Sequence, residues 1–290
     1  MTKKAIKTIY ALISLFLFSV MCEQQPNRYG QAFLPKENER LLFTHQYCYP
    51  EYHKQNLPKP FGIAFYANLN QDVVVSFKSE TPIRHLYTLL DSMETAVPLI
   101  LLRLSNAQLA SIPTGAHDDD ISQLANTLKH FNRPVYLAPG FEVNHPMYRI
   151  DPETFVNAYR YFVENMKSLN VDNVSYVWHV IGMKPRWEDP IPLEACYPGD
   201  DYVNWLGLTV HNIQPHHYSE EGFFEASIYG EVAEFAHQNK LPMMICESST
   251  RSVKKNYDLS GEALWEDWYE PFFGMIEQYD IRAISHIFYS

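Results

Sequence analysis

The chain has 290 residues, 46% of them hydrophobic, and a formal net charge of −11. This apolar content can fill a large core, and a β/α barrel of roughly 250 residues is one of the few single domains of that size. The acidic balance argues against a nucleic-acid partner, because a polyphosphate is bound by a basic surface.

The N-terminus has the pattern of an export signal. Three lysines among the first seven residues precede an apolar run that ends at Cys22, and this run is too short to stay in a bilayer as an anchor. Residues 19–22 resemble a bacterial lipobox, in which the cysteine is acylated, although Met21 stands where a small residue is usual. We expect removal of residues 1–21 and an exported protein. It is either a cell-surface or periplasmic lipoprotein anchored through Cys22 or a secreted protein without lipid.

Residues 22–40 are polar and aperiodic, so we expect a tether there, followed by one domain over residues 41–290. The domain has no internal repeat and no low-complexity tract. Its three cysteines, Cys48, Cys196 and Cys246, have neither the spacing of metal ligands nor the density of a disulfide scaffold. We expect buried thiols or at most one bridge.

Eight short apolar runs rich in strand-forming residues follow one another along the domain, and helical patterns separate most of them. The runs are 41–46, 62–68, 99–104, 135–141, 174–179, 205–210, 243–247 and 283–289. Strands that alternate with helices form a parallel sheet, and eight such units close a (β/α)₈ TIM barrel. The chain stops at the eighth run, so we expect either a barrel without its last helix or a truncated chain.

The clearest helix is predicted to begin at Asp151-Pro152, because aspartate is a good N-cap and proline fits the first helical position. Asn170 is typical of its end. Apolar residues recur between these two points with a helical period, at Phe155, Ala158, Tyr159, Phe162, Met166 and Leu169. Similar amphipathic stretches occupy residues 121–131, 223–238 and, after Ser260, 263–279.

Two glutamates follow apolar strands of the predicted barrel. Glu142 comes after the fourth run and Glu247 ends the seventh, and the C-terminal ends of all strands of a parallel barrel meet at one rim. Glycoside hydrolysis needs a proton donor and a nucleophile or base across the scissile bond. Each glutamate alone is more often a helix cap or an arginine partner, but the pair indicates a glycosidase.

The sequence around these glutamates resembles the family 26 glycoside hydrolases. The family's acid/base motif, Arg-Pro-x-His-Glu-Met-Asn, lines up with residues 138–144, where the proline, the glutamate and the asparagine match. This resemblance assigns Glu142 as the acid/base and Asn144 as a substrate or supporting contact. The family's nucleophile strand, Lys-Pro followed by apolar residues and glutamate, is similar to residues 241–247 and assigns Glu247 as the nucleophile.

Two other stretches carry the resemblance further. Residues 173–179 resemble the family's fifth strand, and residues 197–207, which begin Tyr-Pro-Gly-Asp, resemble its approach to strand six. The chain departs from the family at Phe141 and Ala138, which replace a histidine and an arginine. His211 stands where a tyrosine usually supports the nucleophile, so we expect it either to orient Glu247 or to be a structural histidine. Asn212 beside it is expected to reach a sugar hydroxyl.

Aromatic residues on the predicted rim offer flat faces on which sugar rings stack. We expect Tyr66, Tyr148, Trp178 and Trp187 to line a substrate cleft, with core or loop packing as the competing interpretation for each.

The remaining histidines give no sign of a metal centre. His145, His216 and His217 do not match the spacing of a zinc or iron site. We therefore expect neither a catalytic metal nor another cofactor.

Together these features predict a retaining, endo-acting glycoside hydrolase on a β-linked polysaccharide such as β-mannan, β-1,3-xylan or β-glucan. Retention follows from the family resemblance and implies carboxyl groups about 5–5.5 Å apart, with a raised pKa for Glu142 and an ionised Glu247. The alternative is a non-catalytic surface lipoprotein that binds glycans with a degenerate barrel. We expect a monomer that touches a membrane only through a lipid anchor.

Overall fold

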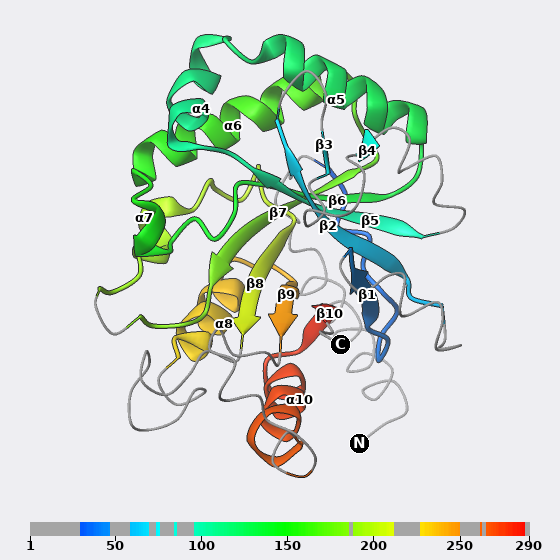
Figure 1. The fold of residues 1–290 in the computed structure, drawn as a ribbon, viewed down its shortest axis with the longest axis vertical. Coiled ribbons are helices and arrows are strands. Elements are labelled where there is room, and N and C mark those ends of the chain that lie inside the picture. Colours follow the sequence, from blue (N-terminus) through cyan, green and yellow to red (C-terminus); the bar gives the residue numbers. More distant parts are fainter. Residues whose placement is uncertain are drawn as a thin grey trace, which may run out of the picture.

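The computed structural model describes residues 30–46, 59–69, 74–75, 84–85, 96–185, 188–211, 227–249, 262 and 265–287. Eight parallel strands form a closed barrel, in which each strand pairs with its neighbours in the chain order and the last pairs with the first (Figure 1). They are β1 (Leu41–His45), β2 (Gly62–Asn68), β5 (Val97–Arg103), β6 (Val135–Pro139), β7 (Val174–Ile181), β8 (Trp205–His211), β9 (Met243–Ser249) and β10 (Ile281–His286). The predicted (β/α)₈ barrel is confirmed.

The strand boundaries differ from the predicted ones at a few ends. β6 stops at Pro139, before the turn that carries Glu142, and β9 continues past Glu247 to Ser249. Between β2 and β5, the short strands β3 (Val74–Val75) and β4 (Arg84–His85) form an antiparallel pair that the sequence did not predict. These strands hold two residues each, too few to leave a periodic pattern.

The barrel strands are buried on both faces. Outward side chains form one large cluster with the helices, and inward side chains form a second, smaller cluster inside the barrel. In β7, for example, Tyr176 and Trp178 belong to the outer cluster and Val177 to the inner one. Both faces are apolar because helices cover the outside of a barrel and side chains fill its inside.

The predicted helix at Asp151 is α6 (Pro152–Ser168). The Asp151 carboxylate accepts a hydrogen bond of 2.8 Å from the backbone nitrogen of Thr154, one of the amide groups that a helix start leaves unpaired. Its buried residues include Phe155, Phe162 and Met166, as the periodicity predicted. The helix packs this face onto the barrel, which fixes the loop between β6 and α6 at the rim.

The other predicted helices are also present. They are α5 (Asp118–Phe131), α8 (Tyr229–Gln238) and α10 (Glu270–Gln278), the last preceded by the π-helical turn η4 (Trp265–Tyr269). Shorter elements are α4 (Asn106–Ser111), η1 (Ile112–Thr114), η2 (Pro146–Tyr148) and α7 (Leu193–Cys196). In Figure 1, α4, α5 and α6 lie together on one side of the barrel, away from α10. Within the described part of the chain, no helix has the length and hydrophobicity needed to cross a bilayer.

Residues 30–36, which the sequence analysis assigned to a polar tether, pack against the barrel. Their carbonyl groups accept hydrogen bonds from the Tyr136 hydroxyl, the Trp205 indole and Arg282. Phe33 contacts the Tyr136 ring at a centroid distance of 6.4 Å. Because Tyr136 and Trp205 lie near the starts of β6 and β8, this segment closes the N-terminal end of the barrel.

The Tyr-Pro-Gly-Asp stretch has a structural role. The Pro198 carbonyl accepts a hydrogen bond of 2.6 Å from Arg160 of α6, and the Tyr202 hydroxyl donates one of 2.7 Å to Glu164 of the same helix. The Asn204 side chain accepts from the backbone nitrogen of Tyr176. These bonds dock the loop before β8 onto α6 and β7, remote from the rim that carries the glutamates.

Several sequence predictions fall outside the described residues. They concern Cys22, Cys48, Trp187, Asn212, His216, His217 and Ser260. Of the other cysteines, Cys196 and Cys246 are both free and buried, as expected for structural thiols.

Candidate active site

Glu142 is held at the rim by a strained turn. The turn begins after Pro139 at the end of β6, and Gly140 has a φ of 106°, which favours glycine. A Cβ atom at Gly140 would lie 2.7 Å from Cε2 of Phe155. Glu142 itself has a φ of 46°, a left-handed conformation that non-glycine residues adopt rarely.

Glu247 reaches the inside of the barrel because of a β-bulge. Leu208 pairs with Ile245, but Thr209 pairs with Glu247, so Cys246 is an extra residue in β9. In a regular strand Glu247 would share the outward face of Ile245, which packs in the outer cluster. The bulge shifts this alternation by one residue and turns the carboxyl group inward.

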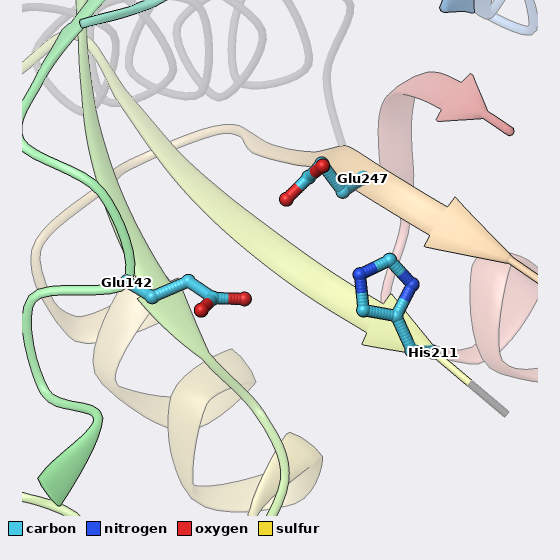
Figure 2. A group of neighbouring side chains, drawn as sticks. All are labelled: Glu142, His211 and Glu247. Carbon is cyan, nitrogen blue, oxygen red and sulfur yellow. The ribbon is translucent and has the colours of Figure 1, made fainter. Parts of the chain in front are cut away.

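The two carboxyl groups and His211 converge at the C-terminal rim (Figure 2). One oxygen of Glu142, one oxygen of Glu247 and one ring nitrogen of His211 all lie within 4.8 Å of one another. In Figure 2 the Glu142 and Glu247 side chains extend toward each other from opposite sides of β8, which carries His211. Such a short separation matches the retaining type of glycosidase site and not the wider inverting type.

Glu142 combines burial with hydrogen bonds. It is 6% exposed, and the Tyr148 hydroxyl donates a hydrogen bond of 3.1 Å to its Oε2. Burial raises the pKa of Glu142, while hydrogen bonds from Thr209 and Tyr148 and the charge of Arg103 act in the lowering direction. The net rise matches the expectation for a proton donor.

Glu247 is more isolated. It is 1% exposed, and neither carboxyl oxygen has a hydrogen-bond partner among the described residues. Burial raises its pKa to about 8. The expectation of an ionised Glu247 is therefore wrong for this structure, because no donor compensates the loss of water around the charged form.

His45 is the nearest polar neighbour of Glu247 from β1. Its Nε2 lies 3.9 Å from Oε1 of Glu247, within ion-pair distance. Burial, together with repulsion by His211 and Arg103, lowers the pKa of His45 to about 3. The ring is consequently neutral at neutral pH, and this contact is not an ion pair.

Three further histidines surround the glutamates. Burial lowers the pKa of His179 to about 3 and those of His211 and His286 to about 4. The His179 Nε2 lies 2.9 Å from the Thr209 hydroxyl, and the His286 Nδ1 lies 2.7 Å from the Ser248 hydroxyl. These rings are neutral at neutral pH and can accept or donate one hydrogen bond at each nitrogen.

The predicted aromatic residues divide between site and core. Tyr66 lies on the inner face of β2 and contacts the Phe141 ring at 5.7 Å, and Tyr148 bonds Glu142. Trp178 corrects the prediction, because it lies on the outer face of β7, fully buried against Tyr197 at 5.1 Å and Phe235 at 5.5 Å. A sugar in the barrel mouth cannot reach it.

Asn144 also differs from the prediction of a substrate contact. It is fully buried, and its amide bonds the backbone of Ile181 twice, accepting from the nitrogen at 2.7 Å and donating to the carbonyl at 3.2 Å. Both ends of the amide are used, so Asn144 fixes the Glu142 loop to the end of β7. This is the supporting role that the sequence left open.

The geometry also meets one requirement of a metal site. Glu142, His211 and Glu247 present three ligand atoms of the kinds that bind divalent cations. However, the same carboxyl groups carry raised pKa values, and a metal must displace those protons to bind. A proton-transfer site therefore fits the donor set better than a metal site.

The fold has close counterparts among solved structures. A family 26 β-mannanase from Bacteroides ovatus superimposes with a TM-score of 0.61 at 14% identity, over 86% of this chain and 81% of that chain. An endo-β-1,4-mannanase from Cellulomonas fimi superimposes with a TM-score of 0.64 at 16% identity, over 87% of this chain and 66% of that chain. The fold is that of a divergent family 26-like barrel.

Sequence comparison of this family 26-like barrel finds distant relatives. A β-1,3-xylanase named TXYA from Vibrio sp. is 28% identical over 192 residues, which are 61% of this chain and 40% of the xylanase. A β-1,3-xylanase from Alcaligenes sp. is 25% identical over 234 residues, which are 75% of this chain and 48% of that enzyme. The chain thus spans less than half the length of these relatives. No protein-family model matches it.

The family 26-like barrel also places residues at the site that the sequence analysis missed. His45, Arg103 and His179 each lie at or near the end of an apolar run, on β1, β5 and β7. The pattern that identified Glu142, a polar residue at the end of a buried strand, also holds for these three residues. A search of every apolar run for this pattern would have found His45, Arg103 and His179.

Proposed function

We propose that this chain is a retaining, endo-acting glycoside hydrolase on a β-linked polysaccharide, with Glu142 as acid/base and Glu247 as nucleophile. The observation that carries the proposal is the approach of the two carboxyl groups at the ends of the fourth and seventh barrel strands, where one oxygen of Glu142 lies within 4.8 Å of one oxygen of Glu247. The low identity to solved mannanases gives the fold alone, so the chemistry is argued from the site.

In the first step, Glu142 donates its proton to the glycosidic oxygen while Glu247 attacks the anomeric carbon. The bond to the leaving sugar breaks, and a covalent glycosyl ester forms on Glu247. In the second step, the Glu142 carboxylate takes a proton from water, whose oxygen attacks the same carbon and releases Glu247. Two inversions give net retention.

This cycle needs one proton on the carboxyl pair. Burial raises the pKa of both Glu142 and Glu247, so Glu247 must give up its proton before it attacks. His211 lies beside Glu247, and its Nδ1 has no hydrogen-bond partner among the described residues. We propose that a neutral His211 donates a hydrogen bond from its ring N–H to Glu247, which lowers the pKa of this carboxyl group and favours the ionised form that attacks.

The substrate class is proposed from chemistry and relatives together. Tyr66, Phe141 and Tyr148 give the mouth an aromatic wall, with Phe141 6.0 Å from Tyr148, and sugar rings stack on such surfaces. The curated relatives are named β-1,3-xylanases, and the solved neighbours include mannanases. We therefore propose β-1,3-xylan, β-mannan and β-glucan as the first backbones to test.

The test is release of reducing ends from a panel of these polysaccharides by the purified protein, with product NMR to record the configuration at the anomeric carbon. The proposal requires that the first product released from at least one of these polysaccharides has the β configuration at its anomeric carbon. Glu247→Gln should remove this activity, and Glu153→Gln, an exposed carboxylate on α6, should keep it. Binding of oligosaccharides without any release of reducing ends would instead support a glycan-binding lipoprotein.

Export, lipidation at Cys22 and a monomeric state remain proposals as well. The basic, apolar N-terminus and the lipobox-like residues 19–22 support the first two. Metabolic labelling with palmitate should mark the wild type and not Cys22→Ser. Light scattering of the protein that begins after residue 22 should give the mass of a monomer.

The proposed site works without a metal ion. Chelators should therefore leave hydrolysis unchanged.

A further inference from the structure

Arg103 is a charged residue of the site to which the proposed mechanism gives no role. It is the last residue of β5 and lies two residues beyond Leu101, on the inward face of the strand. Its side chain is exposed, unlike the six buried residues before it. The position places a guanidinium at the mouth of the barrel, beside the aromatic wall.

Two aromatic rings hold this guanidinium. The Arg103 Cζ lies 4.1 Å from the ring centroid of Tyr66 and 5.4 Å from that of Phe141. Cation–π contacts of this kind fix the plane of the guanidinium and leave its N–H groups at the edge available. The sequence departure at Phe141 thus supplies one of the two rings.

The guanidinium has no acceptor among the residues that the structure describes. Among the described residues it makes neither a hydrogen bond nor an ion pair, whereas Arg40, Arg160 and Arg282 each bond a carbonyl or carboxylate oxygen. This is notable in a chain with 34 acidic and 23 basic residues. A guanidinium has five N–H donors, and one that is already oriented can donate two parallel hydrogen bonds to a carboxylate or sulfate.

Arg103 is also within electrostatic reach of the catalytic groups. Its charge acts on Glu142, Tyr148 and His45. Of these groups, His45 is neutral at neutral pH, because its pKa is lowered to about 3. An anion bound here would lie next to the sugar that undergoes cleavage.

We propose that Arg103 binds an anionic substituent of the glycan, the carboxylate of a uronic acid or a sulfate ester, and so selects acidic polysaccharides over neutral ones. This inference rests on the proposed glycan-cleaving function and names the substrate class more narrowly. The stacked guanidinium, the free donors and the adjacent acid/base are the observations that carry it.

The test compares matched substrates. The backbones are β-1,3-glucan, β-1,3-xylan and β-mannan. For each backbone, a neutral oligosaccharide is compared with its sulfated form. For β-1,3-glucan and β-mannan, the neutral oligosaccharide is also compared with the uronate form that is oxidised at C6. On the backbone that is cleaved, kcat/KM should favour one anionic form over the neutral one by about tenfold to a hundredfold, as for a hydrogen-bonded charge pair. The form that shows this preference identifies the carboxylate or the sulfate as the ligand.

Arg103→Gln should bring the ratio of kcat/KM for the anionic and neutral substrates close to one, mainly by raising KM of the anionic substrate. Arg103→Lys should retain part of the preference. Arg133→Gln is the matched control, because Arg133 also stacks on a ring, Phe131 at 4.0 Å, but lies just before the start of β6. It should leave the preference unchanged. The inference would be overturned if the wild type preferred the neutral form on every backbone. It would also be overturned if Arg103→Gln lowered kcat/KM equally for the anionic and the neutral substrates.

Calorimetric binding of the same oligosaccharides separates this inference from the proposed function. Arg103-dependent binding of anionic forms without hydrolysis would end the hydrolase proposal and support the anion site. Hydrolysis whose anionic-to-neutral ratio is the same in wild type and Arg103→Gln would support the hydrolase and end the anion site.

Discussion

At the scale of single residues, the two glutamates differ in what holds their carboxyl groups. Glu142 receives hydrogen bonds from Thr209 and Tyr148, whereas Glu247 has none among the described residues. The first arrangement suits a group that alternates between acid and base. The second leaves a carboxyl group whose ionisation depends on neighbours and on the substrate.

The division of labour predicts different losses for the two alanine variants. Glu247→Ala should abolish turnover, because no nucleophile remains, while oligosaccharide binding persists. Glu142→Ala should lose about 10²- to 10⁴-fold on natural substrates but much less on dinitrophenyl glycosides, whose leaving group departs without a proton. Azide should rescue Glu142→Ala and yield a β-glycosyl azide. Equal losses on both substrates with no azide effect would make the acid/base assignment wrong.

The raised pKa of Glu247 predicts a pH-dependent effect on stability. Its folded-state pKa of about 8 lies above the ordinary value of 4.5, so the folded protein binds this proton more tightly than the unfolded chain does. The contribution of Glu247 to the free energy of unfolding therefore falls as the pH rises from about 4.5 to about 8. Glu247→Gln cannot ionise and should be more stable than wild type above pH 8, by on the order of 5 kcal/mol, and no more stable below pH 4.5.

Urea unfolding of Glu247→Gln, Glu153→Gln and wild type at pH 4, 6 and 8.5 measures this difference. Only Glu247→Gln should gain stability relative to wild type as the pH rises. A constant difference across these pH values would mean that Glu247 is not held protonated in the fold.

At the scale of elements, two backbone irregularities place the side chains of the two glutamates. The turn at Gly140 carries Glu142, and the bulge at Cys246 turns Glu247 into the barrel. Both irregularities lie next to regular strands whose apolar side chains hold them in place.

The Gly140 turn can be tested against a turn with the same backbone conformation. Gly140 and Gly199 have φ values of 106° and 105°, but an added Cβ would lie 2.7 Å from Phe155 at Gly140 and no closer than 3.5 Å to any neighbour at Gly199. Gly199→Ala should lose about 1 kcal/mol of stability from the backbone alone. Gly140→Ala should lose about 2–4 kcal/mol, since overpacking adds to the backbone cost, and should also lower kcat because Glu142 moves.

Thermal unfolding and kcat on the best substrate measure both variants. If Gly140→Ala keeps wild-type kcat, the turn does not position the acid/base.

At the scale of the whole molecule, the barrel is closed at its N-terminal end by residues 30–36. The Tyr136 hydroxyl donates a hydrogen bond of 2.7 Å to the Phe33 carbonyl, and Arg282 donates one of 2.9 Å to the Lys36 carbonyl. The rim that carries Glu142 and Glu247 lies at the other end of the strands. If the proposed function holds, the two ends divide stability from chemistry, as in other barrels of this type.

This division predicts the effect of shortening the chain. A chain that begins at residue 30 should match a chain that begins at residue 23 in its urea midpoint. A chain that begins at residue 38 should be less stable by about 2–4 kcal/mol, because Tyr136 and Trp205 lose hydrogen bonds and apolar cover. Its kcat at low temperature should change little, and a loss of activity without loss of stability would contradict the division.

The sequence by itself determined the eight strands, the α6 start at Asp151 and the pair Glu142 and Glu247, because apolar runs, caps and strand-end acids are local patterns. Only the tertiary structure decided which buried face each residue occupies. Both faces of a barrel strand are apolar, so the sequence of β7 reads the same whether Trp178 points to the mouth or to α8. The bulge at Cys246 has no local signature either. The meeting of His45, Arg103 and His211 at one rim depends on barrel closure, which joins residues far apart in the chain.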